Sequence, residues 1–153
     1  MNKFYIMVLF VMGFTVAKVT FAQDSQSDLV EFLNSETSKK NGLPFSQAVR
    51  VGNMLLLSGE IGVDKSQGKL VKGGIKAEAE QTMLNIKNTL VSHGYSMKNI
   101  VKCTVMLADI SEWQAFNEVY TTFFETPYPA RSAFGANGLA LGAKVEVECI
   151  AAV

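Results

Sequence analysis

The sequence contains a single histidine, His93, and only two cysteines, Cys103 and Cys149. One histidine cannot supply the ligands of a zinc site, and the cysteines lack the spacing of metal ligands. His93 stands at the expected end of a helix, where a partial positive charge suits the helix dipole. These counts therefore argue against a metal centre, and they favour a structural role for the histidine over a catalytic one.

Known catalytic and nucleotide-binding motifs are also missing. There is no nucleophile elbow, no P-loop and no GxGxxG segment. The formal net charge is zero, and the basic residues form no cluster. Because nucleic-acid binding needs concentrated positive charge, the sequence predicts no nucleic-acid partner.

The main uncharged hydrophobic run lies at the N-terminus. It covers residues 4–17, follows Lys3, and is followed by small residues at Thr20 and Ala22. This layout is typical of a secretory signal peptide, and the run is short for a membrane span. We expect cleavage after Ala22, no stable membrane insertion after cleavage, and a periplasmic or secreted protein. A retained membrane anchor is the alternative.

The remaining chain divides into a polar linker, residues 23–42, and one domain, residues 43–153. Apolar and polar periodicities predict seven elements in the order β-β-α-β-α-β-β. These are strands at 47–51 and 54–58, a helix at 74–93, a strand at 99–108, a helix from 111, and strands at 130–134 and 143–151. The pattern predicts an α+β fold with two helices on one face of a mixed sheet. The other face would need cover, which oligomerisation can provide.

Both cysteines fall within predicted strands, at positions expected to be buried. Buried cysteines often pack as free thiols, whereas export would permit a disulfide. The sequence leaves both states open.

Three polar residues are candidates for a binding or catalytic site. Arg131, one of only two arginines, follows the stiff segment between Pro127 and Pro129. Its planar fork of donors matches a carboxylate, although a surface salt bridge is the alternative. Glu146 alternates with apolar neighbours in the last strand, which indicates a solvated face or a base lining a pocket. Asn117 lies on the apolar side of the second helix, where its amide needs partners.

Four blocks give these candidates a context: residues 44–49 with Ser58-Gly59, residues 116–120 preceded by Asp109, residues 129–132, and residues 145–148. Their order and spacing over residues 43–153 resemble the RidA family, also called YjgF-like and often labelled endoribonuclease L-PSP.

The resemblance implies a chorismate-mutase-like fold, a homotrimer with pockets between subunits, and no cofactor. It implies hydrolysis of enamine/imine intermediates such as 2-aminoacrylate to a 2-keto acid and ammonia, so the ligand is a small imino or keto acid. In this reading Arg131 binds the substrate carboxylate and Glu146 positions or activates water. Ser58, Gly59 and Phe45 line the pocket, and Asn117 lies at its edge.

Two positions depart from the family pattern. Phe45 stands where active members commonly carry tyrosine, and Ala133 stands where cysteine is frequent. A non-catalytic small-carboxylate binder or a holdase-like protective protein is therefore the alternative function. Ribonuclease activity is disfavoured, because the chain without residues 1–22 is slightly acidic and has no histidine pair.

Overall fold

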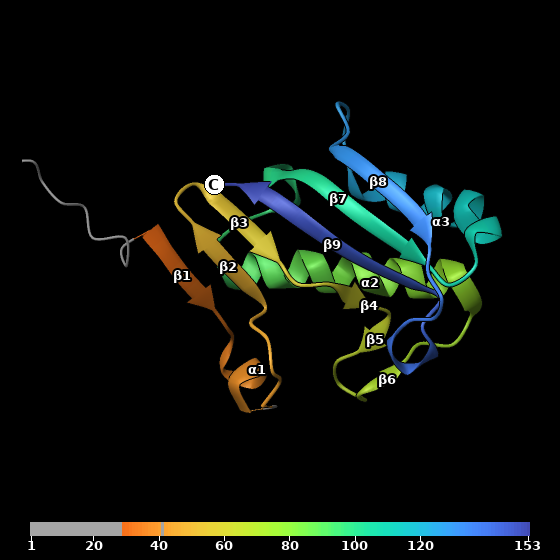
Figure 1. The fold of residues 1–153 in the computed structure, drawn as a ribbon, viewed down its shortest axis with the longest axis horizontal. Coiled ribbons are helices and arrows are strands. Elements are labelled where there is room, and N and C mark those ends of the chain that lie inside the picture. Colours follow the sequence, from red (N-terminus) through yellow and green to blue (C-terminus); the bar gives the residue numbers. More distant parts are fainter. Residues whose placement is uncertain (1–28, 41) are drawn as a thin grey trace, which may run out of the picture.

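The computed structural model describes residues 29–40 and 42–153, so the expected signal peptide lies outside the described residues. One mixed sheet dominates, with the order β1-β2-β3-β9-β7-β8 and with β4 also paired to β9 (Figure 1). Among the described strands of this sheet, only β7 and β8 pair in parallel. The strands are β1 Val30–Leu33, β2 Ala48–Val51, β3 Met54–Leu57, β4 Glu60–Ile61, β7 Ile100–Leu107, β8 Ala130–Gly135 and β9 Val145–Ala152. A separate small hairpin joins β5 Val63–Asp64 to β6 Lys69–Leu70.

Two helices cover one face of this sheet (Figure 1). They are α2 Gly74–Ser92 and α3 Trp113–Tyr120, and a short α1 spans Glu36–Lys40. Single 3₁₀ turns occur at Met97–Asn99, Ile110–Glu112, Thr121–Phe123 and Ala140–Gly142. The order β2-β3-α2-β7-α3-β8-β9 confirms the predicted α+β arrangement. None of the described helices has the length and apolar character needed to cross a membrane.

The hydrophobic patterns explain how the helices and the sheet form one core. The stripe that predicted α2 is buried, with Met83, Ile86 and Leu90 fully covered. On β9, Val145 and Val147 are equally inaccessible, whereas the glutamates between and after them are not. The apolar side chains of the helical stripe and of the alternating strand thus pack in one layer between the helices and the sheet.

The segment expected as a linker contributes a strand instead. β1 pairs antiparallel with β2, and Arg50 forms a 2.9 Å salt bridge to Glu31 across this pair. Four residues in polar surroundings give a weak strand signal, and their partner at the sheet edge is set by tertiary structure. The sheet therefore begins at Val30, ahead of the expected domain start at residue 43.

The two cysteines form a disulfide, which decides between the two open states. Cys103 on β7 lies directly opposite Cys149 on β9, with their Cα atoms 4.1 Å apart. Such a close approach is typical of a non-hydrogen-bonded antiparallel pair. The bond joins two central strands inside the core.

His93 forms the C-terminal cap of α2. Burial lowers the pKa of its imidazole, and the Glu31 carboxylate opposes this shift. A lowered pKa favours the neutral imidazole, which weakens the predicted interaction with the helix dipole.

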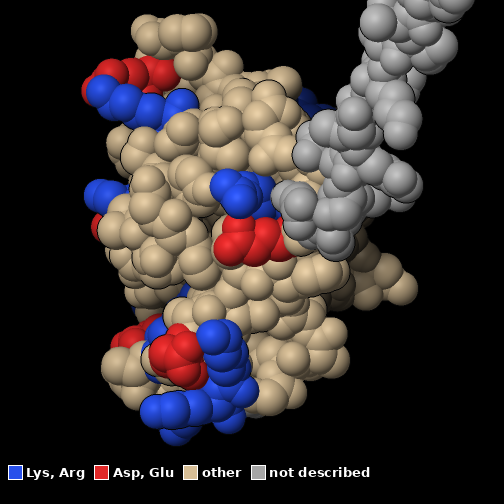
Figure 2. Space-filling view, turned by 90° about the vertical axis from the view of Figure 1, so that its left-hand side faces the viewer, with Lys and Arg blue, Asp and Glu red and all other residues tan. Residues whose placement is uncertain are grey.

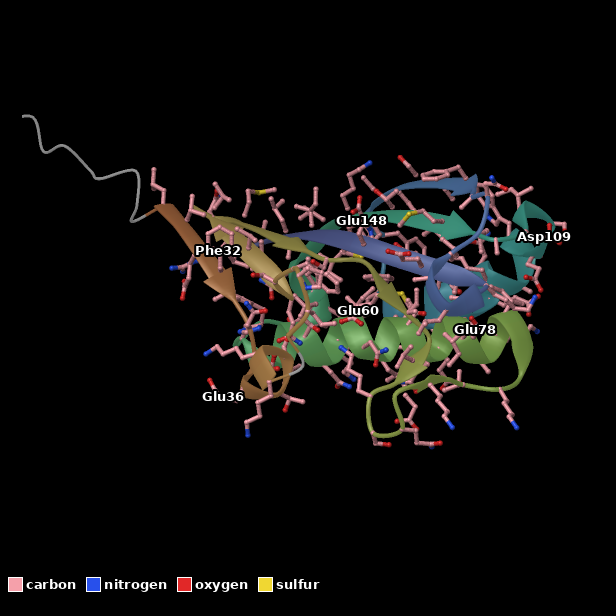
Figure 3. All side chains as sticks on the ribbon, turned by 60° about the horizontal axis from the view of Figure 1, so that its bottom comes forward. Phe32, Glu36, Glu60, Glu78, Asp109 and Glu148 are labelled. Carbon is pink, nitrogen blue, oxygen red and sulfur yellow. A yellow bond between two sulfur atoms is a disulfide. The ribbon has the colours of Figure 1, made fainter. Side chains whose placement is uncertain are left out.

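The sheet face opposite α2 and α3 is bare over β1 to β3. Its exposed apolar side chains include Phe32, Val51 and Leu56, and Phe32 on β1 is 70% exposed (Figure 3). The end of the molecule that carries β1 is mostly uncharged, with charged side chains in a few separate groups (Figure 2). No described element of the chain covers this face, as the sequence predicted.

Candidate active site

Glu146 projects from β9 onto the helix-free face of the sheet. Burial raises the pKa of its carboxyl group, and the nearby Glu148 carboxylate raises it further. A carboxylate with a raised pKa takes up a proton more readily near neutral pH, which suits a general base. The second effect follows from the alternation of β9, which places both glutamates on one face.

Gly59 packs directly against this carboxylate. It follows Ser58 at the end of β3, and a Cβ atom added at Gly59 would overlap the Glu146 carboxylate oxygen. A side chain at this position would displace the Glu146 carboxylate, so glycine allows the close approach. The predicted site residues Gly59 and Glu146 are brought together.

A pocket of about 310 Å³ is lined by Gly59, the neighbour of the Glu146 carboxylate. Phe45, Ser58 and Gly59 all contribute to its wall, together with Ser35 and Leu43. The Ser58 hydroxyl donates a 2.6 Å hydrogen bond to the Ser46 carbonyl oxygen. The hydroxyl proton is therefore not free to bind a ligand. Ser58 is thus held as a fixed part of the wall.

Asn34 ties the chain around β1 to this wall. Its Nδ2 donates to Ser46 Oγ at 3.0 Å, and its Oδ1 accepts from the Gln47 backbone N–H at 3.0 Å. The Gln47 side chain in turn accepts from the Ser35 backbone N–H at 2.7 Å. Sequence reasoning missed Asn34 and Ser35, because both fall in the polar segment expected as a linker.

Arg131 lies on β8 at the opposite edge of the sheet. Its guanidinium carbon stands 4.7 Å from the centre of the Tyr120 ring and 5.6 Å from that of Trp113. Among the described residues it forms neither a salt bridge nor a side-chain hydrogen bond. The plain salt bridge considered from the sequence is therefore absent from the described chain.

Asn117 lies on the same face of α3, between Trp113 and Tyr120 at helical spacing. Its Oδ1 and the Tyr120 hydroxyl oxygen are buried without a hydrogen-bond partner among the described residues. Burial raises the pKa of Tyr120, partly opposed by the Arg131 charge. Buried polar atoms without a partner are uncommon in folded proteins, so this face of α3 is a candidate binding surface.

The sheet register separates Arg131 from Glu146. Arg131 pairs with Cys103, and Cys103 pairs with Cys149, so these three side chains share the helix-covered face. Glu146 precedes Cys149 by an odd number of residues and therefore points to the other face. The predicted site residues of one chain therefore fall into two candidate half-sites, Arg131 with Asn117, and Glu146 with Ser58, Gly59 and Phe45.

Comparison with known proteins identifies the family. The model of the family described as endoribonuclease L-PSP matches residues 37–153. The chain belongs to the RidA family. A goat 2-iminobutanoate/2-iminopropanoate deaminase is 44% identical over 108 residues, covering 71% of this chain and 79% of the goat protein.

Solved structures agree with this RidA assignment. RidA from the Antarctic bacterium Psychrobacter has a TM-score of 0.69 and 40% identity, covering 72% of this chain and 89% of its own. The E. coli protein TdcF with bound serine has a TM-score of 0.69 and 32% identity, covering 72% and 89% respectively. The α+β fold expected from the sequence is thus that of RidA proteins.

Within residues 29–40 and 42–153, no three His, Cys, Asp or Glu side chains gather in a way that could hold an ion.

Proposed function

We infer that this RidA protein hydrolyses reactive enamine/imine intermediates of the 2-aminoacrylate type to a 2-keto acid and ammonia. The observation that carries this inference is the 44% identity to an imine deaminase. The Arg131 guanidinium, which forms no salt bridge among the described residues, supports a carboxylate substrate. Glu146, with its raised pKa, supports acid–base chemistry.

The active site we propose is composite. Because Arg131 and Glu146 lie on opposite faces of one sheet, a second copy must bring its own half-site to complete the pocket. The bare apolar face around Phe32 and Leu56 supports association of copies. With the family resemblance, these features favour a homotrimer with one pocket at each subunit boundary.

In the proposed reaction, Arg131 binds the substrate carboxylate through two parallel N–H donors. Glu146 accepts a proton from water as the water oxygen attacks the imine carbon, and the imine nitrogen receives that proton. The resulting carbinolamine collapses: its hydroxyl proton passes through Glu146 to nitrogen, the C–N bond breaks, and ammonia leaves. Because the imine is already electrophilic, positioning and one base suffice.

An imine-hydrolysis assay tests this proposal. An amino-acid oxidase generates imines in the presence of semicarbazide, and the loss of semicarbazone measures hydrolysis by the purified protein. We expect Arg131→Ala and Glu146→Gln to abolish the acceleration. The chain offers matched controls in Arg50→Ala, which removes the other arginine, and Glu148→Gln on the same strand face. Equal activity in Arg131→Ala and Arg50→Ala would contradict the role of Arg131.

A non-catalytic small-carboxylate binder is the second candidate, and Phe45 is the observation that favours it. Phe45 lines the pocket without the hydroxyl that could hold water or substrate. If no imine is hydrolysed faster than in buffer while a keto acid still binds, this alternative replaces the enzymatic one. A gain of activity in Phe45→Tyr would identify the missing hydroxyl as the reason.

We also propose that the protein is exported and that cleavage follows Ala22. The Cys103–Cys149 disulfide supports this location, because disulfides persist in oxidising compartments such as the periplasm. Cell fractionation and intact mass of the purified protein test it. A cytosolic protein that retains its N-terminal methionine would contradict export.

A further inference from the structure

We propose that Trp113 and Tyr120 are positioning residues that hold the Arg131 guanidinium by cation–π contact, which leaves its hydrogen-bond donors free for a carboxylate. The proposal rests on the proposed function, in which Arg131 receives the substrate. It adds the reason why this side chain is ordered without an acidic partner.

The contact geometry is that of cation–π pairs. The guanidinium carbon lies 4.7 Å from the centre of the Tyr120 ring and 5.6 Å from that of Trp113, within the usual limit of about 6 Å. An aromatic face attracts the guanidinium through the ring quadrupole and accepts none of its N–H bonds. An aspartate or glutamate in the same place would occupy the donors that a substrate needs.

The aromatic support is itself fixed. Tyr120 is 3% exposed, and its ring packs against Phe116 and Phe124 with centroids 5.5 Å and 4.8 Å away. Trp113 stands seven residues earlier on α3, on the same helical face, and is 37% exposed. The buried ring supplies a rigid floor, and the more exposed ring lies where a ligand can reach the cation.

The backbone of Arg131 is fixed as well. Its β-strand partner is Cys103, which the disulfide ties to Cys149 on the next strand. Both ends of the arginine side chain are therefore restrained before any ligand binds. Such preorganisation lowers the entropic cost of binding a small carboxylate.

Two features distinguish this role from ordinary packing. Removal of an aromatic face should weaken binding of the carboxylate and raise KM, while kcat changes little, because the proposed role of the rings is to hold the guanidinium and not to transfer a proton. A ring of another aromatic residue should restore binding, whereas an aliphatic side chain of similar volume should not.

The test uses pyruvate, a 2-keto acid, as the probe. Trp113 is the only tryptophan in the chain, so its fluorescence reports directly on the contact with Arg131. We expect pyruvate to change the emission of the wild-type protein and to leave that of Arg131→Met unchanged. Calorimetry should give a Kd for Trp113→Phe and Tyr120→Phe within about twofold of wild type, and about tenfold weaker binding for Trp113→Leu. Melting temperatures of the variants control for folding.

Each result has a defined meaning. Equal pyruvate affinity in Trp113→Leu, Trp113→Phe and the wild type would overturn the proposal, as would absence of pyruvate binding by the wild type. A tenfold loss in Tyr120→Phe would also overturn it, because the hydroxyl and not the ring would then matter. If pyruvate binds as expected but no imine is hydrolysed, the positioning role stands and only the deaminase function fails.

Discussion

At the scale of single residues, the candidate site depends on two unusual environments. Glu146 keeps a carboxyl group that burial makes harder to ionise, and Gly59 leaves just enough space for it. Arg131 carries a charge whose protein contacts, within the described chain, are aromatic. Polar groups placed in this way serve binding or catalysis at some expense of folding stability.

Glu146→Gln should make the protein inactive and, at neutral pH, more resistant to heat. The folded state raises the pKa of Glu146, so the folded protein binds this proton more tightly than the unfolded chain does. Stability linked to Glu146 is fully present below the unfolded pKa and is lost as the pH rises through the folded pKa. Glutamine does not ionise, so the variant does not lose this stability as the pH rises. Melting curves of both proteins at pH 7 and at about pH 3.5 test the effect, since the glutamate is mostly protonated at the lower pH.

The expected gain in melting temperature should shrink at the acidic pH. A constant difference between the two proteins would show that packing rather than ionisation separates them. Glu148→Gln is the control, because its carboxylate lies on the same strand face and is exposed.

At the scale of elements, the N-terminal segment around β1 and α1 acts as one wall of the pocket. Asn34 joins it to the start of β2 through two side-chain hydrogen bonds, to Ser46 and to Gln47. The pocket size therefore depends on a segment that lies outside the central sheet strands.

Asn34→Ala should loosen this wall. The substitution leaves the Gln47 N–H without its acceptor, and the loss of such a bond costs about 1–3 kcal/mol when the group is buried. We expect a lower free energy of unfolding in urea and a higher KM. Asn88→Ala is the matched control, because Asn88 is exposed on α2. Equal effects of the two substitutions would contradict a specific role for Asn34.

The disulfide between β7 and β9 should contribute strongly to stability. It closes a loop with a sequence separation of 46, for which chain-entropy arguments give about 4 kcal/mol. We expect dithiothreitol to lower the urea midpoint of the wild-type protein. A Cys103→Ala/Cys149→Ala double variant should already have the lower midpoint and should not respond. A response of that variant to reductant would point to an effect unrelated to this bond.

At the scale of the whole molecule, periodicity predicted most of the fold, because the patterns reflect one core. The stripe of α2 and the alternation of β9 both point to the layer that is buried. The strand at Val30 and the disulfide depend on pairing partners far along the chain, so local sequence could not decide them. The separation of Arg131 from Glu146 likewise follows from strand register, which the motif spacing does not contain.

The bare sheet face should be the surface through which copies associate. Leu56→Lys places a charge at a position that is 43% exposed in the single chain. If copies bury this face, the charge would be desolvated, and the assembly should dissociate with loss of imine hydrolysis. Light scattering after size exclusion measures the oligomeric state. Val91→Lys on α2, at 58% exposure, is the control and should leave the assembly intact.

Because the two half-sites lie on opposite sheet faces, two variants that are inactive alone should restore activity when they assemble together. A chain with Arg131→Ala still offers Glu146, and a chain with Glu146→Gln still offers Arg131. When equal amounts are unfolded together and refolded into mixed copies of the proposed trimer, about a quarter of the subunit boundaries should join two intact halves. Recovery of about a quarter of wild-type activity from two inactive parents would be the signature of a shared site, and no recovery would mean that each chain works alone.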